Sequence, residues 1–119
     1  INGITDQGIL EELSRNSNAA VRLLAVKKLT NKRILGDIAR NDPSHLVRRA
    51  ALEEVNDQAT IRSVAIEDID PAVRKAAVQK ITSPATLAEV IAADKDPGVV
   101  TEAKARLILV ESMPAGSQP

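Results

Sequence analysis

Residues 70–77 read Asp-Pro-Ala-Val-Arg-Lys-Ala-Ala, and this stretch returns in altered forms along most of the chain. Its centre reappears 26 residues earlier as Val-Arg-Arg-Ala-Ala at 47–51. The windows 44–69 and 70–95 are identical at eight of 26 positions, and most of their other core matches exchange Leu, Ile and Val. A fixed period of this length indicates a repeat architecture.

Four columns of residues recur at this interval of 26: valines, small alanines, larger aliphatic residues and arginines. A partial further unit precedes them at the N-terminus. The columns are Val21, Val47, Val73 and Val99; Ala25, Ala51, Ala77 and Ala103; Leu29, Val55, Ile81 and Leu107; and Arg22, Arg48 and Arg74.

Each unit predicts two short amphipathic helices. Apolar residues recur at intervals of three and four, as in Val47, Ala50 and Ala51, which places them on one helix face. We expect first helices near 19–29, 45–55, 71–81 and 97–110, and second helices near 7–15, 32–41, 58–67 and 84–93.

The expected helix starts carry capping residues. Asp-Pro at 70–71 and 96–97, and Ser-Pro at 83–84, place a side-chain acceptor before a proline at the first helical position, where a missing N–H costs nothing. One column consists entirely of good N-cap residues: Asp6, Asn31, Asp57 and Ser83.

The Asp-Pro-x-Val-Arg-x-Ala-Ala pattern of residues 70–77 resembles HEAT-like repeats, and the short unit is similar to compact bacterial HEAT-like repeats, including the phycobilisome-lyase type. The resemblance covers roughly residues 4–110. It implies an all-α, armadillo-like fold: an α-solenoid of about four 26-residue two-helix units wound as a right-handed α-α superhelix. Stacked hairpins share a core that no single hairpin can form. We expect one domain over 1–110 and a flexible tail or linker over 111–119.

The composition excludes several kinds of site. The 119 residues include no Cys, Phe, Trp or Tyr and one His, which rules out stacking platforms for bases, aromatic cages, disulfides and thiolate or multi-histidine zinc sites. We therefore expect no cofactor and no metal. We also expect no membrane partner, since the longest apolar runs are only a few residues. A cytoplasmic module cut from a longer polypeptide is the expected setting, because residue 1 is Ile and Cys is absent.

Two acidic patterns have a structural explanation. Asp68-x-Asp70 and Asp94-x-Asp96 could be read as calcium ligands, but the other spaced oxygen ligands of a calcium loop are missing and the motif recurs at helix starts. Capping is therefore the favoured interpretation. His45 opens a first helix without a nucleophile or metal partner in the pattern, which favours a solvated or capping-region residue.

An acidic column follows the arginine column by 20 residues. It predicts a structural ladder of ion pairs linking the start of one first helix to the turn entering the next unit, each pair worth about 0.2–1 kcal/mol. Pairing at a separation of six fits less well, because it would set Arg22 against Asn16 and Asp94 against Val100. The predicted pairs are Arg22 with Asp42, Arg48 with Asp68, and Arg74 with Asp94.

Charge is distributed unevenly although the formal net charge is zero. Residues 15–50 hold nine Lys or Arg against two acids, whereas 1–14 and 51–119 are both net acidic. This indicates either ordinary solvated faces or a basic surface for an acidic partner. The resemblance implies that second helices line a concave side, where alanines 85, 88 and 92 would form an apolar strip. The candidate binding residues there are Arg33, Asp37, Arg40, Arg62 and Ile66.

Three functions follow as hypotheses. The first is a non-enzymatic scaffold that binds a protein or peptide along the concave face, the partner being acidic near 15–50. The second is salt-dependent, sequence-blind binding to a nucleic-acid backbone through the basic 15–50 region. The third, implied only by the resemblance to lyase-type repeats, is a tetrapyrrole lyase-like accessory role.

The last first helix has the character of an end. Glu102 and Lys104 replace apolar residues found at the matching positions of other units, as a solvent-facing terminal helix requires. Residues 107–110, however, are all aliphatic. This segment is expected to fold back on the last helix pair or to dock a following element.

Overall fold

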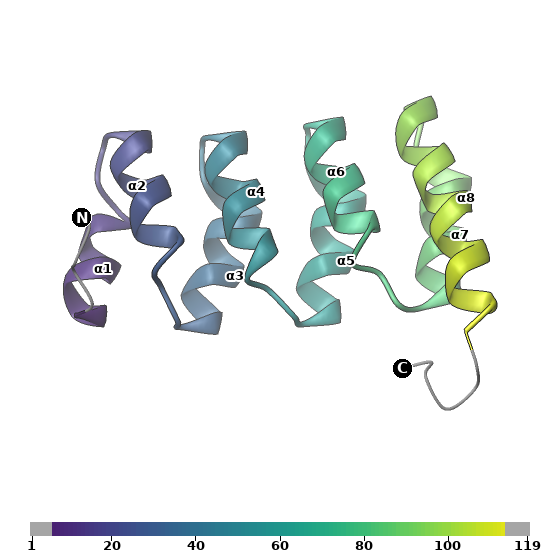
Figure 1. Cartoon of the computed structure of the whole chain (residues 1–119). Helices are drawn as coiled ribbons and strands as arrows, with labels where there is room; N and C mark the ends of the chain where they lie inside the picture. The colour runs from purple at the N-terminus through teal and green to yellow at the C-terminus, as the bar shows by residue number, and fades with distance from the viewer. Residues whose placement is uncertain (1–5, 114–119) are drawn as a thin grey trace. The chain divides into compact units, whose positions relative to one another are not determined.

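The computed structural model describes residues 6–113, and within that stretch the backbone forms eight α-helices and no β-strand (Figure 1). The all-α prediction is confirmed for these residues. The helices are α1 (Gln7–Leu13), α2 (Ala19–Val26), α3 (Lys32–Asn41), α4 (His45–Glu53), α5 (Gln58–Glu67), α6 (Pro71–Val78), α7 (Pro84–Ala93) and α8 (Pro97–Glu111).

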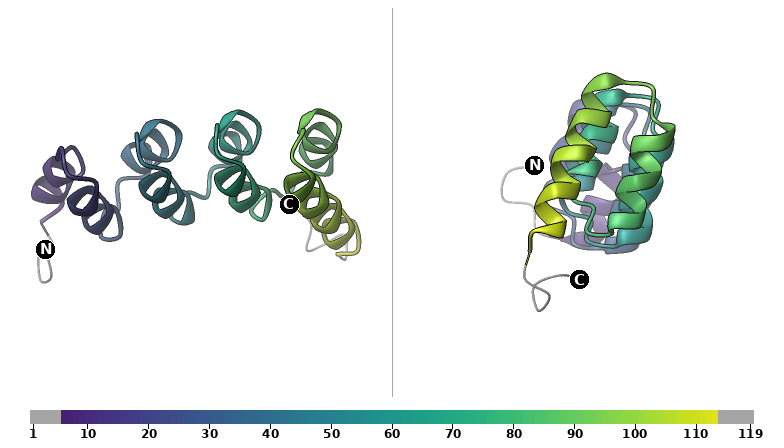
Figure 2. Two further views of the ribbon diagram at one scale, coloured as in Figure 1. Left: turned by 90° about the horizontal axis from the view of Figure 1, so that it is seen from above. Right: turned by 90° about the vertical axis from the view of Figure 1, so that its right-hand side faces the viewer.

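The chain divides into two compact units, an N-terminal unit that ends at Val55 and a C-terminal unit that begins at Asn56. In the N-terminal unit α1 packs against α2, α3 against α4, and α2 against α4. In the C-terminal unit α5 packs against α6 and α7 against α8, and these pairs meet mainly through α6 and α8. The C-terminal unit therefore has α5 and α7 in one layer and α6 and α8 in the other (Figure 2). A single domain over 1–110 stays a prediction.

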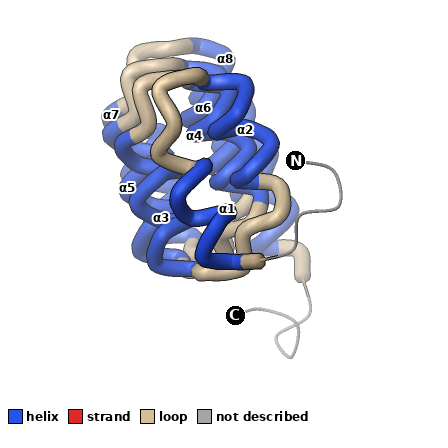
Figure 3. The backbone as a smooth tube through the Cα atoms, turned by 90° about the vertical axis from the view of Figure 1, so that its left-hand side faces the viewer, coloured by secondary structure: helices blue, strands red, loops and turns tan. Residues whose placement is uncertain are grey.

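The two helices that pack as a hairpin are not the two helices of one 26-residue sequence unit. The closest-packed consecutive helices are joined by turns of three residues at 42–44, 68–70 and 94–96 (Figure 3). Each turn joins a second helix to the first helix of the following sequence unit, because three residues suffice to reverse the chain. The five-residue links at 27–31 and 79–83 instead connect one hairpin to the next.

Side-chain capping fixes most helix starts, as the sequence predicts. Asn31 Oδ1, for example, accepts the N–H of Ile34 at 3.1 Å. Ser44 is the exception, since it precedes α4 without a side-chain cap bond. Prolines occupy the first turn of α6, α7 and α8, as expected. Capping side chains begin seven of the helices: Asp6, Asn18, Asn31, Asp57, Asp70, Ser83 and Asp96.

Three first helices end two or three residues earlier than predicted. Helices α2, α4 and α6 stop at residues 26, 53 and 78, whereas the apolar pattern continues to 29, 55 and 81. The final aliphatic residue of each pattern is still buried, but it lies in a tight turn; Leu29, for instance, donates its N–H to both Ala25 O and Val26 O. The chain leaves the helix axis there so that the next N-cap residue can begin a new helix.

The alanine column lies in the core. Ala25, Ala51, Ala77 and Ala103 are all fully buried. Ala25 and Ala51 lie on α2 and α4, which contact each other in the N-terminal unit, and Ala77 and Ala103 lie on α6 and α8, which contact each other in the C-terminal unit. Small side chains at these positions let neighbouring helices approach closely, which a purely aliphatic core without aromatic rings accommodates.

Candidate functional site

Two of the predicted ladder pairs lie within a single unit, and both form. The Nε and Nη2 atoms of Arg22 donate to the two carboxylate oxygens of Asp42 at 3.0 and 3.1 Å. Arg74 and Asp94 make the same two-pronged contact at 2.8 and 3.2 Å. Both pairs are largely buried, with side-chain exposures of 11% and 5% in the first and 16% and 6% in the second. Arg48 and Asp68 belong to different units, and their pairing stays a prediction.

The same arginines also bind the main chain six residues back. Arg74 Nη1 donates to Asp68 O and Arg48 Nη1 to Asp42 O, each at 2.9 Å. Arg22 Nη1 reaches Asn16 O at the same distance. At a separation of six residues, which the sequence disfavours for side-chain pairing, each arginine therefore contacts a main-chain carbonyl instead. Each guanidinium of this column holds the start of its own helix.

The acidic partners brace the turns. Asp42 and Asp94 each accept the backbone N–H of the residue two positions ahead at 2.9 Å. Burial by itself would raise the pKa of Asp94, but hydrogen bonds from Arg74 and from the Asp96 and Lys95 amides, with the attraction of the Arg74 charge, lower it on balance. These pairs therefore act within the fold, where they hold turns and helix starts together.

The sequence reasoning missed a second recurring contact, in which the first residue of a second helix binds main-chain atoms of the loop after its partner helix. The Gln7 side chain donates to Lys28 O at 3.2 Å and accepts the Thr30 N–H at 3.0 Å. Gln58 makes the equivalent bonds to Lys80 O and Thr82 N–H. Lys32, at the matching position of α3, donates to Glu54 O at 2.8 Å. In α1, α3 and α5 the first residue of the helix thus closes the open end of its hairpin, and the recurrence of Gln at 7 and 58 was the available signal.

Three of the candidate binding residues lie together on α3. The Asp37 carboxylate stands between Arg33, one turn before it, and Arg40, one turn after it, at 3.6 and 3.4 Å. All three side chains are exposed, Arg33 at 78%. Two cations around one carboxylate leave this face of α3 with a net positive charge.

The other two candidates, Arg62 and Ile66, lie on α5 in the C-terminal unit. Arg62 Nη2 donates to Glu89 Oε2 at 2.6 Å, which ties α5 to α7. The hydrogen bond and charge of Glu89 raise the pKa of Arg62 above its ordinary value. The pair was missed because Arg62 belongs to no repeated column of basic residues. Ile66 is exposed one turn beyond Arg62, and alanines 85, 88 and 92 are exposed on α7.

The basic 15–50 stretch is less uniform than its composition indicates. Arg22 is neutralised by Asp42, and Arg48 is buried against a turn carbonyl. Lys32 is held on the Glu54 carbonyl, next to the acidic pair at 53–54. Arg33 and Arg40 on α3, by contrast, pair with Asp37 at the surface and stay exposed.

Within residues 6–113, no three His, Asp or Glu side chains gather in a group that could hold a metal ion. Asp70 and Asp96 cap α6 and α8, in line with the capping interpretation of the Asp-x-Asp motifs. The described helices are all too short or too polar to cross a membrane. The tail predicted over 111–119 lies outside the described residues from 114 onwards, and Glu111 still belongs to α8.

Comparison of the chain with protein-family models, curated proteins and solved structures finds no match.

Proposed function

We propose that this chain is a non-enzymatic scaffold of HEAT-like repeats, stacked as a right-handed α-solenoid, that binds a protein or peptide along a concave face formed by the exposed sides of α3, α5 and α7. One observation carries the proposal: the repeated arginines Arg22 and Arg74 of the first helices are engaged in internal contacts, whereas Arg33 and Arg40 on the second helix α3 stay exposed. Arg22 and Arg74 are each bound on two sides, while Arg33 remains 78% exposed.

The repeated contacts support the stacked arrangement. Arg22 in the N-terminal unit and Arg74 in the C-terminal unit have equivalent partners, 20 residues ahead and six behind. Gln7 and Gln58 are equivalent in the same way. Equivalent contacts at the same or nearly the same sequence spacing are what a helical array propagates from one repeat to the next.

The chemistry of the exposed faces suits a peptide with two kinds of ends. The α3 face offers guanidinium groups on Arg33 and Arg40 to a carboxylate, and arginine binds carboxylates in a planar two-pronged geometry. The α5 and α7 faces offer Ile66 and exposed alanines to alkyl groups. We therefore infer an amphipathic segment, acidic at the end that meets α3.

The nucleic-acid alternative loses two of its nine cations, because Arg22 and Arg48 are held by turn carbonyls and Asp42 opposes the charge of Arg22. A phosphate backbone needs several free cations on one surface. The hypothesis of a tetrapyrrole lyase-like accessory role rests on the resemblance alone.

Selection from a random peptide library displayed on phage, with the full chain as bait, tests the proposal. We expect the enriched peptides to combine acidic residues with an aliphatic cluster, and binding to fall about tenfold or more in Arg33→Glu/Arg40→Glu and in Ile66→Asp. Arg15→Glu/Lys27→Glu is the matched control, because it makes the same change of charge away from these faces and should bind normally. Equal loss in the control, or no loss in either face variant, would contradict the proposed surface.

A further inference from the structure

Helix α8 is about two turns longer than its counterparts α2, α4 and α6, and its extra residues break the repeat pattern. The positions matching Ile108 are Thr30, Asn56 and Thr82, and those matching Leu109 are the N-cap residues Asn31, Asp57 and Ser83. Without a capping residue at 109 the helix continues instead of ending. Two polar columns are thus replaced by aliphatic side chains that no requirement of the repeat explains.

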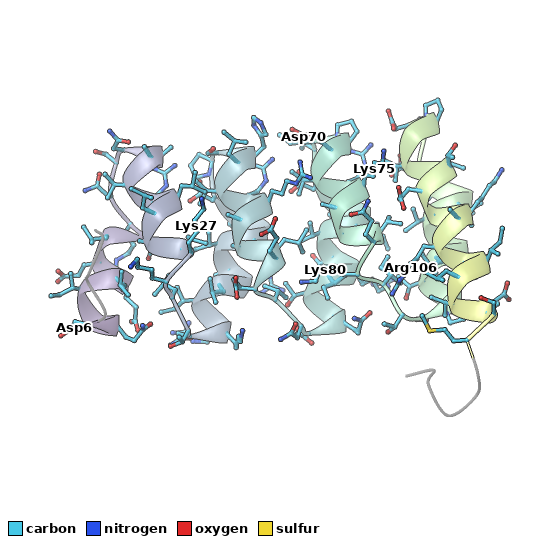
Figure 4. The ribbon with its side chains drawn as sticks, in the orientation of Figure 1. Asp6, Lys27, Asp70, Lys75, Lys80 and Arg106 are labelled. Atoms are coloured by element: carbon cyan, nitrogen blue, oxygen red, sulfur yellow. The ribbon has the colours of Figure 1, made fainter. Side chains whose placement is uncertain are left out.

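The extension is a fixed part of the C-terminal unit. Arg106 reaches from α8 towards the loop after α6 (Figure 4), where its Nε donates to Ile81 O at 2.9 Å. Val110, near the end of the extension, is 1% exposed. The opposite side is open, with Ile108 69% and Leu109 50% exposed. A helical segment that is aliphatic all round is normally covered on every side.

Two unpaired charges flank this open side. Lys104 and Glu111 are exposed, and neither forms an ion pair among the described residues. They lie seven residues apart, so both are on the same helix face with Ile108 between them. If two such helices pack antiparallel about a twofold axis, Lys104 of each copy faces Glu111 of the other. A parallel pair would set Lys104 against Lys104.

We propose that two copies of this chain associate through the outer face of α8, antiparallel about a twofold axis. The midpoint between Lys104 and Glu111 falls next to Ile108, so the two Ile108 side chains meet near the axis and two Lys104–Glu111 pairs close the ends. The interface is isologous, with the same patch used twice. It uses none of the residues proposed for partner binding on α3, α5 and α7, and it does not depend on that proposed function.

Sedimentation equilibrium of the full chain tests the association. Between about 1 µM and 1 mM we expect the mean mass to rise from the monomer value of 12.7 kDa towards twice that value. Ile108→Glu should raise the dimer dissociation constant at least about tenfold, since it places a charge at the axis. Ile69→Glu is the matched control, because Ile69 is 88% exposed in the turn between α5 and α6.

A charge exchange tests the antiparallel register. Lys104→Glu and Glu111→Lys should each weaken the dimer about threefold to tenfold, and the double variant should restore it, because the pair reforms with reversed sign. Far-UV circular dichroism and thermal melting check that every variant stays folded. A chain that remains monomeric to 1 mM overturns the proposal and leaves the face to another occupant. Dimerisation unaffected by Ile108→Glu, or charge variants without mutual rescue, overturns it equally.

Discussion

A single arginine in this protein holds three parts of the chain at once. Arg74 uses Nε and Nη2 for Asp94, at the turn into α8, and Nη1 for the carbonyl of Asp68, ahead of its own helix. A planar guanidinium has donors in the directions that this arrangement needs, whereas a lysine offers one compact charge. The aspartate in turn accepts a backbone N–H, so each pair joins two turns and two helices.

Replacing Arg74 by Ala should lower the free energy of unfolding by about 1–3 kcal/mol, because a buried carboxylate and a turn carbonyl both lose their donor. Urea unfolding followed by circular dichroism measures this, since the chain has no aromatic residue to report by fluorescence. Arg33→Ala removes an equally charged side chain from an exposed pair and should cost no more than about 0.5 kcal/mol. Similar losses in both variants would show that burial of the Arg74 pair adds nothing.

Stability should also depend on pH through Asp94. Its pKa is lowered in the folded protein, so the contribution of the charged carboxylate is fully present above the ordinary aspartate pKa of about 3.9 and is lost as the pH falls through the lower folded-state pKa. We expect the wild type to be more stable than Asp94→Asn at pH 7 and this difference to shrink steadily below pH 4. A difference that stays constant from pH 7 to pH 3 would contradict the assignment.

At the scale of the helix, local capping decided which boundaries could be foreseen. The bounds of α3, α5 and α7 match the prediction because an N-cap side chain starts each one and an aspartate of the acidic column ends it. The ends of α2, α4 and α6 do not match. There the apolar period continues through a turn, and periodicity alone does not separate a last helical turn from a buried loop residue.

The contact between α6 and α8 gives a prediction about packing. Ala77 is fully buried on α6, so Ala77→Leu should overpack this contact and cost about 1–3 kcal/mol of unfolding free energy. Ala85→Leu adds the same side chain on the exposed face of α7 and should change stability by less than about 0.5 kcal/mol. Midpoints of urea unfolding give both values. A neutral Ala77→Leu would mean that the alanine column is not a close-packed seam.

At the scale of the whole molecule, sequence reasoning correctly predicted the features that recur from one repeat to the next. Eight helices, most of their caps and the partnering of Arg22 and Arg74 all follow from columns that recur every 26 residues. The pairing of Arg62 with Glu89 occurs once, so nothing in the pattern marked it. Sequence reasoning also missed which consecutive helices pair into hairpins. A repeating sequence has no intrinsic first position, and only the three-residue turns determine the pairing.

The Gln58 and Arg74 contacts bear on how such a chain can lengthen. Gln58 binds only main-chain atoms of the loop after α6, and Arg74 needs one main-chain carbonyl and one aspartate that every copied unit would bring with it. A duplicated stretch of 26 residues would therefore have the partners of both contacts already present, without compensating changes in its neighbours. The choice of contact partners therefore allows the chain to lengthen by tandem duplication, and such duplication would leave a 26-residue spacing in the sequence.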